Sequence, residues 1–321
     1  MFVWINFLGM IKIGIIGWDK HLQHLTNLVK GMEGFLLTGW MNDSSENNED
    51  PDSSELMAFH SFEAFHRCVD AVAITYKSDE TFETICLCLK YFKHVFLLNA
   101  QRLKYKDFIY LHKISEESNV RFYPEFGSLI PDANDVPIEG LMGIQFVDLN
   151  QTFSPNEGIC VDGRLSLALL RDVFFLTSLI GANVKKITAN GWGFSELGAG
   201  MLNAKIDFDN GTSVNILLAN SVKPRQTEIV IYGRCETLRI SSIDNITKIS
   251  RESLTKGQID CHEKIFPKDS SLRYDLNNFF SSIHNIDSGL RFLEHKYQSF
   301  RMTHLIQEKI NHFASINIFY S

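Results

Sequence analysis

The sequence lacks paired cysteines and clustered basic residues, and each absence excludes a class of function. Its six cysteines form no C-x-x-C pair and show no regular spacing, which predicts buried free thiols, no zinc site and a reducing compartment. The chain has 31 lysines and arginines against 38 aspartates and glutamates, and its longest basic cluster, residues 102–106, is interrupted by Leu103 and Tyr105. This mild acidity, a formal net charge of −7, argues against a nucleic-acid surface, which needs clustered cations to displace counterions.

Secretory and membrane-spanning segments are also missing. The apolar start MFVWINFLGM has no cationic n-region and no small-residue cleavage site, so no signal peptide is expected. It is too short to cross a bilayer, and no later segment reaches that length without charges, so we expect a cytoplasmic protein with no membrane partner. Met10 directly precedes the first good strand, so residues 1–9 are either a native extension or a misassigned start.

Several catalytic signatures are absent as well. The sequence holds no H-E-x-x-H metal motif, no G-x-S-x-G nucleophile elbow and no Gly-Lys-Ser/Thr of a Walker loop. We therefore expect no metal site and neither the hydrolytic nor the nucleotide-hydrolysing chemistry that these motifs support.

The first 122 residues alternate short apolar strands with helical segments. We expect strands at 11–16, 35–41, 71–75, 95–98 and 120–123, and helices beginning near His24 and at 61–68, 79–92 and 105–118. The polar run 42–54 has no periodicity and predicts a loop. Strands that alternate with helices at this pace form a parallel sheet with right-handed crossovers, so residues 1–122 are predicted to form an α/β domain.

From residue 123 the pattern changes to that of an α+β domain. We expect strands at 142–149, 184–189, 199–208, 212–220, 228–232 and 237–241, and helices at 165–179, 276–283 and 289–310. Asp209-Asn210-Gly211 lies between two of these strands and is a strong hairpin signal. Residues 123–321 are therefore predicted to form a largely antiparallel sheet backed by helices.

Five short motifs resemble those of the Gfo/Idh/MocA oxidoreductases, the family of glucose-fructose oxidoreductase and inositol dehydrogenase. Residues 11–17 (IKIGIIG) with the following H-L-x-x-L resemble that family's first strand and helix, and residues 70–75 (DAVAIT) its D-x-V-x-I strand and threonine. Residues 93–96 (KHVF) resemble its G-K-H-V run. Residues 208–211 (FDNG) and 231–238 (IYGRCETL) resemble its F-x-N-G hairpin and I-x-G-x-x-G-x-L strand. The resemblance covers nearly the whole chain.

This resemblance implies a fold and an activity. Residues 1–122 would form a Rossmann dinucleotide-binding domain, and residues 123–321 an α+β domain whose open, largely antiparallel sheet packs against a second subunit. The family oxidises a sugar or cyclitol hydroxyl by hydride transfer to NAD or NADP. We therefore expect a homodimer through the C-terminal sheet and a small-molecule ligand in the cleft between the domains.

The phosphate-binding turn departs from the G-x-G-x-x-G pattern. Gly17 is the first fingerprint glycine, but the second position falls on Asp19 and the third near Leu22, and the turn is one residue short. Gly14, Gly17, Trp18 and Asp19 are the residues of this turn in the predicted cofactor-binding set. Asp19 would place a carboxylate beside a diphosphate, which is strongly repulsive when both are desolvated. Its alternative role is to cap the first helix, and the lysine and histidine that follow it could face a phosphate.

The remaining cofactor positions are also altered. Asn42 occupies the place of the acidic residue that holds the adenosine ribose, and no arginine follows to bind a 2'-phosphate. If a dinucleotide binds, NAD is therefore favoured over NADP. Thr75 and Asn99 end the third and fourth of the expected strands and complete the predicted cofactor-binding set. The alternative is that no dinucleotide binds.

The resemblance places the catalytic lysine at Asn99, and an aspartate and the catalytic histidine at Leu165 and Leu169, so that only Asp172 is retained. Asparagine cannot act as acid or base, and leucine leaves no general base within reach. Leu165 and Leu169 are expected to extend an apolar helical stripe, and Asp172 to be a structural partner. Glu125 is the remaining carboxylate that could serve as acid or base.

Three functions stay open on this evidence. The first is a sugar or polyol oxidoreductase with a rearranged site. The second is a non-catalytic homologue that binds a small molecule or a partner protein in the old cleft, and the third is a dimeric scaffold subunit. The joint change at Asp19, Asn99, Leu165 and Leu169 favours the second and third.

Overall fold

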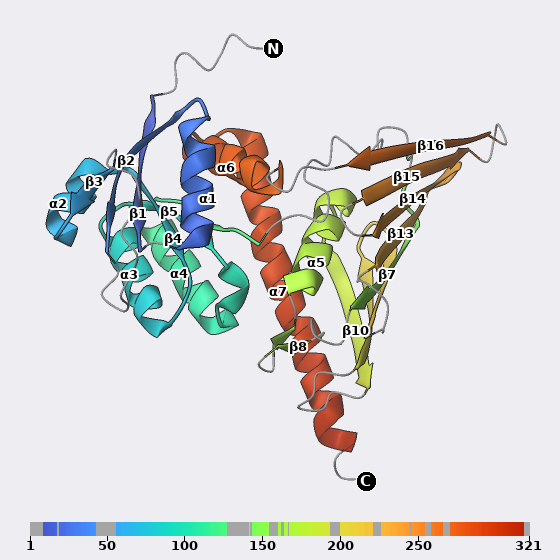
Figure 1. The fold of residues 1–321 in the computed structure, drawn as a ribbon. Coiled ribbons are helices and arrows are strands. Elements are labelled where there is room, and N and C mark those ends of the chain that lie inside the picture. Colours follow the sequence, from blue (N-terminus) through green and yellow to red (C-terminus); the bar gives the residue numbers. More distant parts are fainter. Residues whose placement is uncertain are drawn as a thin grey trace. The chain divides into compact units, whose positions relative to one another are not determined.

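The computed structural model describes residues 9–17, 19–42, 56–126, 141, 143–153, 160–161, 164–165, 167–192, 200–220, 226–243, 246–253, 258–265 and 270–317. The chain divides into two compact units (Figure 1). Unit 1 comprises Met1–Gly127 and Leu272–Lys296, and unit 2 comprises Ser128–Ser271 and Tyr297–Ser321. The domain boundary expected between residues 122 and 123 stays a prediction.

Unit 1 is built on a parallel sheet of six strands in the order β3-β2-β1-β4-β5-β6. The strands are β1 (Ile11–Ile16), β2 (Phe35–Met41), β3 (Met57–Phe59), β4 (Ala71–Thr75), β5 (His94–Leu98) and β6 (Phe122–Pro124). From β1 the sheet grows in one direction through β2 and in the other through β4. Beyond the carboxyl ends of β1 and β4 therefore lies the topological switch point, where open α/β sheets bind ligands.

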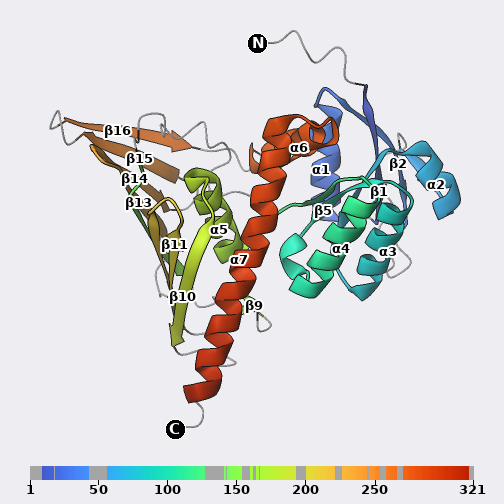
Figure 2. The same cartoon turned by 180° about the vertical axis from the view of Figure 1, so that it is seen from behind.

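Helices cover both faces of this sheet. They are α1 (Lys20–Lys30), α2 (Phe62–Cys68), α3 (Asp79–Lys90), α4 (Tyr105–Glu117), α6 (Ser270–Ile283) and the start of α7 (Asp287–Asn317). Phe122 of β6 packs on Phe108 of α4, whereas the next residue, Tyr123, packs on Phe279 of α6. Successive side chains of a strand point to opposite faces, so α4 and α6 lie on opposite sides. Figures 1 and 2 show α1 beside α6 and α3 beside α4.

Unit 2 is built on an eight-stranded sheet in the order β10-β11-β12-β7-β13-β14-β15-β16. The strands are β7 (Phe146–Phe153), β10 (Val184–Trp192), β11 (Met201–Phe208), β12 (Ser213–Asn220), β13 (Gln226–Tyr232), β14 (Glu236–Ile243), β15 (Ile246–Ser253) and β16 (Gln258–Ile265), with a separate pair β8 (Cys160–Val161) and β9 (Arg164–Leu165). In the large sheet only β12 and β7 run parallel. The predicted fold class, a Rossmann domain plus an α+β domain with a largely antiparallel sheet, is confirmed.

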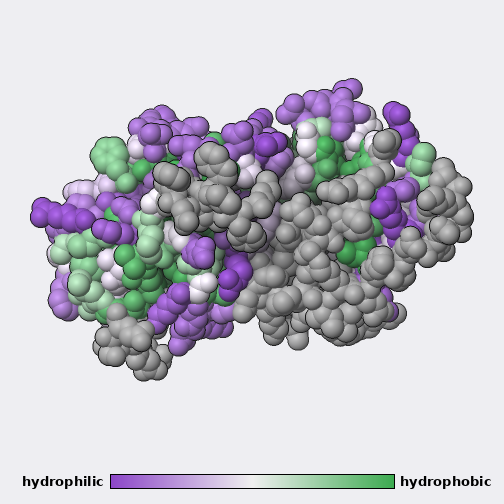
Figure 3. All heavy atoms as spheres, turned by 90° about the horizontal axis from the view of Figure 1, so that it is seen from above, coloured by the Kyte–Doolittle hydropathy of each residue, from purple (hydrophilic) through white to green (hydrophobic). Residues whose placement is uncertain are grey.

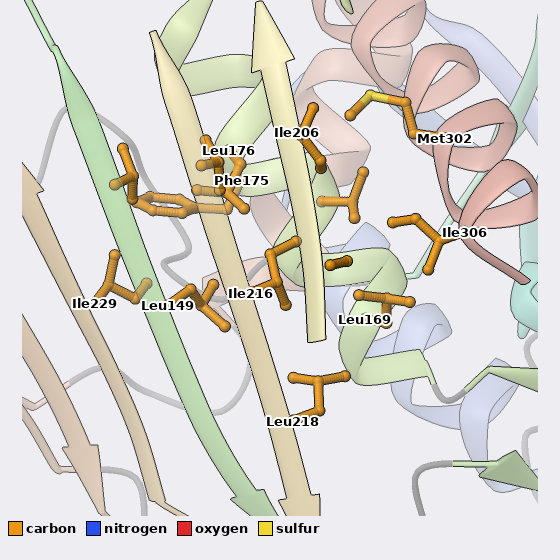
Figure 4. Close-up of a cluster of buried hydrophobic side chains, with 14 of the residues drawn as sticks. Leu149, Leu169, Phe175, Leu176, Ile206, Ile216, Leu218, Ile229, Met302 and Ile306 are labelled. Carbon is orange, nitrogen blue, oxygen red and sulfur yellow. The ribbon is translucent and has the colours of Figure 1, made fainter. Parts of the chain in front are cut away.

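One face of the large sheet is packed, and the other carries polar side chains together with some apolar ones such as Met201. Alternate strand residues such as Ile216 and Leu218 are fully buried against α5 (Leu167–Ile180) and the part of α7 that belongs to unit 2 (Figure 4). On the outer face, Asp148 accepts hydrogen bonds from the amides of Asn150 and Asn215, at 2.9 and 2.8 Å. The homodimer expected through this outer face stays a prediction.

Some local expectations are confirmed and others are wrong. The hairpin at Asp209-Asn210-Gly211 forms, and Gly211 takes the positive φ of 89° that this turn needs. The expectation of buried thiols holds for Cys86 and Cys88, but Cys68 is half-buried and Cys235 is exposed. Cys68 is the last residue of the short helix α2, and Cys235 lies in the turn before β14. At such positions the general tendency of cysteine to be buried does not decide the packing.

Large hydrophobic side chains also reach the surface of unit 1, among them Met57, Tyr91 and Phe92. Figure 3 shows hydrophobic residues interspersed with hydrophilic ones on the face that it draws. This scattered distribution is ordinary for folded proteins. Among the described residues, no helix is both long and apolar enough to cross a membrane.

The amino ends of the strands contain a half-buried histidine. Nδ1 of His94, at the start of β5, accepts a hydrogen bond from the backbone N–H of Arg121 at 2.9 Å. Burial, together with the positive charge of Arg121, lowers the pKa of His94 to about 4. The unfolded chain therefore takes up a proton here before the folded protein does as the pH falls.

We expect this difference to make part of the stability depend on pH. The contribution of His94 is complete above about pH 6.5 and is lost as the pH falls toward about 4, a loss of about 3 kcal/mol. His94→Asn keeps an acceptor for the Arg121 N–H but does not titrate, so its stability should fall less over this range. Urea unfolding at several pH values measures the difference. The exposed His60→Asn is the control, and an unaltered pH dependence in His94→Asn contradicts the assignment.

Candidate functional site

The carboxyl edge of the parallel sheet brings together five of the predicted site residues. Gly17 follows β1, Asn42 follows β2, Thr75 ends β4, Asn99 follows β5 and Glu125 follows β6. The carboxyl ends of parallel strands meet at one edge of a sheet, and this is where a Rossmann domain binds its dinucleotide. The edge is therefore the candidate site of unit 1.

The turn after β1 ends in a carboxylate that caps α1. Gly17 has a φ of 76°, which glycine adopts without strain, and its N–H donates to the Met41 carbonyl at 2.9 Å. Asp19 is the N-cap, as expected, and its Oδ1 accepts from the N–H groups of His21 and Leu22 at 2.8 and 2.9 Å. First-turn N–H groups are the donors that a helix offers to a phosphate. The Asp19 carboxylate thus occupies a position suited to an anion.

A lysine from a neighbouring loop balances this carboxylate. Lys77 lies in the loop between β4 and α3, and its Nζ is 3.8 Å from Oδ2 of Asp19. Both side chains are about four-fifths buried. Lys20 and His21, the cations expected to compensate for Asp19, are exposed on the first turn of α1. Sequence reasoning missed Lys77, although its place two residues after Thr75 already put it at this edge.

Gly14 has a packing role. A Cβ atom at this position would lie 2.5 Å from the Phe65 ring of α2 and 2.6 Å from Val69. Glycine is therefore required for the close approach of α2 to β1, whether or not a cofactor binds. Trp18, also predicted to contact the cofactor, lies outside the described residues.

The Thr75 hydroxyl is buried at the switch point. Thr75 follows Ile74, which pairs with Ile16 of β1, so its side chain lies close to the turn at Gly17. Its Oγ1 has no hydrogen-bond partner within the part of the chain that the structure describes. Leaving a buried hydroxyl unpaired costs about 1–3 kcal/mol. A ligand or an ordered water at this edge would satisfy it.

Asn99 and Glu125 are held side by side by backbone hydrogen bonds. The Glu125 N–H donates to the Leu97 carbonyl at 2.8 Å, and its own carbonyl accepts from Ala100 at 3.3 Å. Asn99 has a φ of 57° and caps the short 3₁₀ helix Ala100–Arg102. Asparagine tolerates this left-handed conformation better than most residues, which gives it a structural reason to be there. Glu125 is half-buried and Asn42 is exposed.

The predicted residues of unit 2 do not form a second reactive group. Leu169 is fully buried in the core between α5 and the sheet, and Asp172 is fully buried on the same helix. The expectation that Leu165 extends a helical stripe with Leu169 is wrong, because α5 begins at Leu167 and Leu165 lies in β9. Arg164–Leu165 pairs antiparallel with Cys160–Val161 instead of joining the helix. A ligand in the cleft between domains stays a prediction.

The phosphate turn does not fit a diphosphate in the way that a G-x-G-x-x-G turn does. A diphosphate at this helix N-terminus would accept from first-turn N–H groups, and two of these, on His21 and Leu22, are already bonded to the Asp19 carboxylate. Within the residues that can be placed, no group of three His, Cys, Asp or Glu side chains is arranged to hold a metal ion. The edge keeps the architecture of a cofactor site but fills its anion position with a side chain.

No protein-family profile matches the sequence, and no curated protein shows significant sequence similarity to it. Solved structures do share its fold. UDP-N-acetylglucosamine 3-dehydrogenase from Acidithiobacillus ferrooxidans is 16% identical, with a TM-score of 0.73 over 95% of this chain and 99% of that chain. A dehydrogenase from Chromobacterium violaceum is 13% identical, with a TM-score of 0.76 over 98% of this chain and 99% of that chain.

A third similar structure was solved with a cofactor. It is a 3-ketoreductase from Actinomadura kijaniata in complex with NADP and TDP-benzene, 13% identical, with a TM-score of 0.68 over 94% of this chain and 98% of that chain. Sequence identities this low carry no information about the residues of the site. The chain therefore shares the fold of these two dehydrogenases and of this ketoreductase.

Proposed function

We propose that this chain is a non-catalytic relative of the Gfo/Idh/MocA sugar oxidoreductases, which binds a small molecule or a partner protein and does not transfer hydride. The observation that carries the proposal is the capping of α1 by Asp19. Its carboxylate accepts hydrogen bonds from two first-turn N–H groups that a diphosphate could otherwise use, and Lys77 forms an ion pair with the same carboxylate. A bound dinucleotide would have to displace an anion that is covalently part of the chain.

The family positions for proton transfer support the same proposal. Asn99 carries no ionisable group, and its left-handed backbone gives it a structural role. Leu169 is buried among hydrocarbon in unit 2, so no proton acceptor replaces the histidine at that position. The buried hydroxyl of Thr75 favours a binding role, since a polar ligand group or water at the switch point would satisfy it.

An active nicotinamide-dependent oxidoreductase is the second candidate. It is favoured by the fold shared with a dehydrogenase and with a 3-ketoreductase that was solved with NADP bound. In that case Lys77 would exchange the Asp19 carboxylate for a phosphate, and Asn42 at the end of β2 would favour NAD over NADP. The two candidates differ in whether the wild-type chain binds the cofactor, so one titration separates them.

Replacing Asp19 with glycine tests the proposal. Asp19→Gly frees the N–H groups of His21 and Leu22 and removes the repulsive carboxylate, while glycine as an N-cap costs only a few tenths of a kcal/mol. We expect no saturable quenching of wild-type tryptophan fluorescence by NADH up to millimolar concentration. Asp19→Gly should show saturable NADH binding, at least about tenfold tighter than the millimolar limit set by the wild type, and should bind NADPH more weakly than NADH.

Two further variants separate the causes. Asp19→Asn keeps a cap acceptor but loses the charge, so a gain in Asp19→Gly alone identifies the occupied N–H groups as the obstacle. Asp79→Asn removes a carboxylate from the first turn of α3 and should leave the binding of NADH and NADPH as it is in the wild type. Micromolar NADH binding by the wild type, with turnover of any polyol, would falsify the proposal.

A further inference from the structure

A cavity in unit 2 lies between the edge strand β10 and α7. Its volume is about 430 Å³, within the usual size range of small-molecule pockets. One wall is the start of β10, from Val184 to Ile187, and the other is the face of α7 that carries Arg301, Leu305 and Lys309. Both walls belong to unit 2. The cavity is therefore separate from the carboxyl edge of the sheet in unit 1.

The inner part of this cavity is hydrocarbon. Ile187 and Met302 are buried side chains of the core of unit 2, and the half-buried Leu305 packs against that core. Figure 4 shows Met302 on α7 opposite Ile206 of the sheet. These three side chains give an occupant an apolar surface to cover, continuous with the core itself.

The mouth of the cavity carries positive charge from both walls. Lys185 and Lys186 come from β10, and Arg301 and Lys309 from α7. Lys186 pairs in register with Asp207 of β11, which partly balances it. Lys185, Arg301 and Lys309 form no ion pair within the residues that the structure describes, and no carboxylate lines the cavity there. Two acidic groups next to lining residues in sequence or by contact have partners of their own, since Asp209 accepts from Asn183 and Glu308 pairs with His304.

This charge is concentrated against the trend of the chain, which has a net charge of −7. Arg301, Leu305 and Lys309 are spaced four residues apart on one face of α7. The apolar side chain of Leu305 therefore has one cation on each side of it along the helix. Lys185 lines the opposite wall of the cavity. The pairing of β10 with β11 shifts register between Val184 and Lys186, so Lys185 is an extra residue without a partner in β11, as in a β-bulge. Like charges that line one cavity repel each other, and an anion would relieve the repulsion.

We propose that this cavity binds a small amphipathic anion, with an aromatic or aliphatic body against Ile187, Met302 and Leu305 and a carboxylate, phosphate or sulfonate between Arg301, Lys309 and Lys185. The guanidinium of Arg301 suits such a group because it can donate two parallel hydrogen bonds to it. The exposed backbone edge of β10 supplies further donors beside the mouth.

Two dyes that differ in one group test this inference. Anilinonaphthalene sulfonate combines an apolar body with an anion, and phenylnaphthylamine has the same rings without the sulfonate; both fluoresce when they leave water. We expect saturable binding of the sulfonate to the full-length protein, with weaker binding of the neutral dye. The double variant Arg301→Gln/Lys309→Gln should weaken binding of the sulfonate about tenfold and leave binding of the neutral dye unchanged.

Control variants assign the binding to this cavity. Lys205→Gln removes an exposed cation from the outer face of the same sheet, and Asp19→Gly alters only unit 1; both should bind the sulfonate as the wild type does. Higher salt should weaken binding of the sulfonate and leave binding of the neutral dye unchanged. The inference is overturned if the wild type shows no saturable binding, if both dyes bind equally, or if the double variant binds the sulfonate with wild-type affinity.

Discussion

Replacing Lys296 with methionine is expected to destabilise unit 1 by about 3–5 kcal/mol. Lys296 of α7 is fully buried, and its Nζ lies 3.0 Å from Oδ1 of Asp275 on α6. The same oxygen accepts a hydrogen bond from the Tyr123 hydroxyl of β6 at 2.9 Å. Methionine removes the cation and leaves a buried carboxylate without its counter-charge.

The surroundings of Lys296 make this charge hard to replace. Its Nζ lies 4.1 Å from the centre of the Phe126 ring and 5.1 Å from that of Tyr123, so aromatic faces surround the ammonium group. Burial and the Asp275 carboxylate raise the pKa of Tyr123 well above its usual range, so the phenol stays a hydrogen-bond donor. Little water can reach the site to solvate Asp275 once the lysine is gone.

The experiment is urea unfolding of three variants. Lys296→Met/Asp275→Asn removes both charges and should recover most of the lost stability, because the uncompensated charge is the main cost. Lys113→Met removes an exposed lysine that pairs with Glu117 on α4 and should cost less than about 0.5 kcal/mol. The buried-pair assignment fails if Lys296→Met costs no more than Lys113→Met, or if the double variant is as unstable as the single one.

Most strands of unit 1 could be predicted to within about two residues because helices cover both faces of the sheet, but β3 was missed. β1, β2 and β4 have the bounds expected from the sequence, and their residues are nearly all apolar, which is typical of buried parallel strands. β15 and β16 were missed. Ile246–Ser253 has only two isoleucines among lysine, arginine, serine and threonine, so its composition resembles that of a loop. A strand near the edge of an open sheet needs few apolar residues.

The site was predictable where its residues follow one another in the chain. The capping role of Asp19 follows from its place directly before a helical segment. Lys77 and Lys296 could not be assigned, because their partners are 58 and 21 residues away in sequence, at Asp19 and Asp275. The sequence of a long polar helix such as α7 does not show which of its lysines is fully buried. Only the folded arrangement of sheet and helices brings these charges together.

The proposed absence of a proton acceptor in unit 2 can be tested at Leu169, where the sequence resemblance would place a catalytic histidine. Leu169 of α5 is fully buried in one hydrophobic cluster with Leu218 of β12 and Ile306 of α7 (Figure 4). A reactive side chain would need access to solvent or substrate. The buried side chains that form this cluster with Leu169 are all hydrophobic. Leu169 is therefore a core residue.

We therefore expect Leu169→His to destabilise the protein by about 3 kcal/mol or more without creating dehydrogenase activity. The imidazole would lose its hydration in an apolar cluster, and its bulk would not match the space that leucine fills. Leu169→Met, which nearly conserves the volume, should cost less than about 1.5 kcal/mol. Thermal and urea unfolding compare the variants, with NADH formation from polyols measured in parallel. If Leu169→His were as stable as Leu169→Met, this position would face an open site, and the case against hydride transfer would lose its support in unit 2.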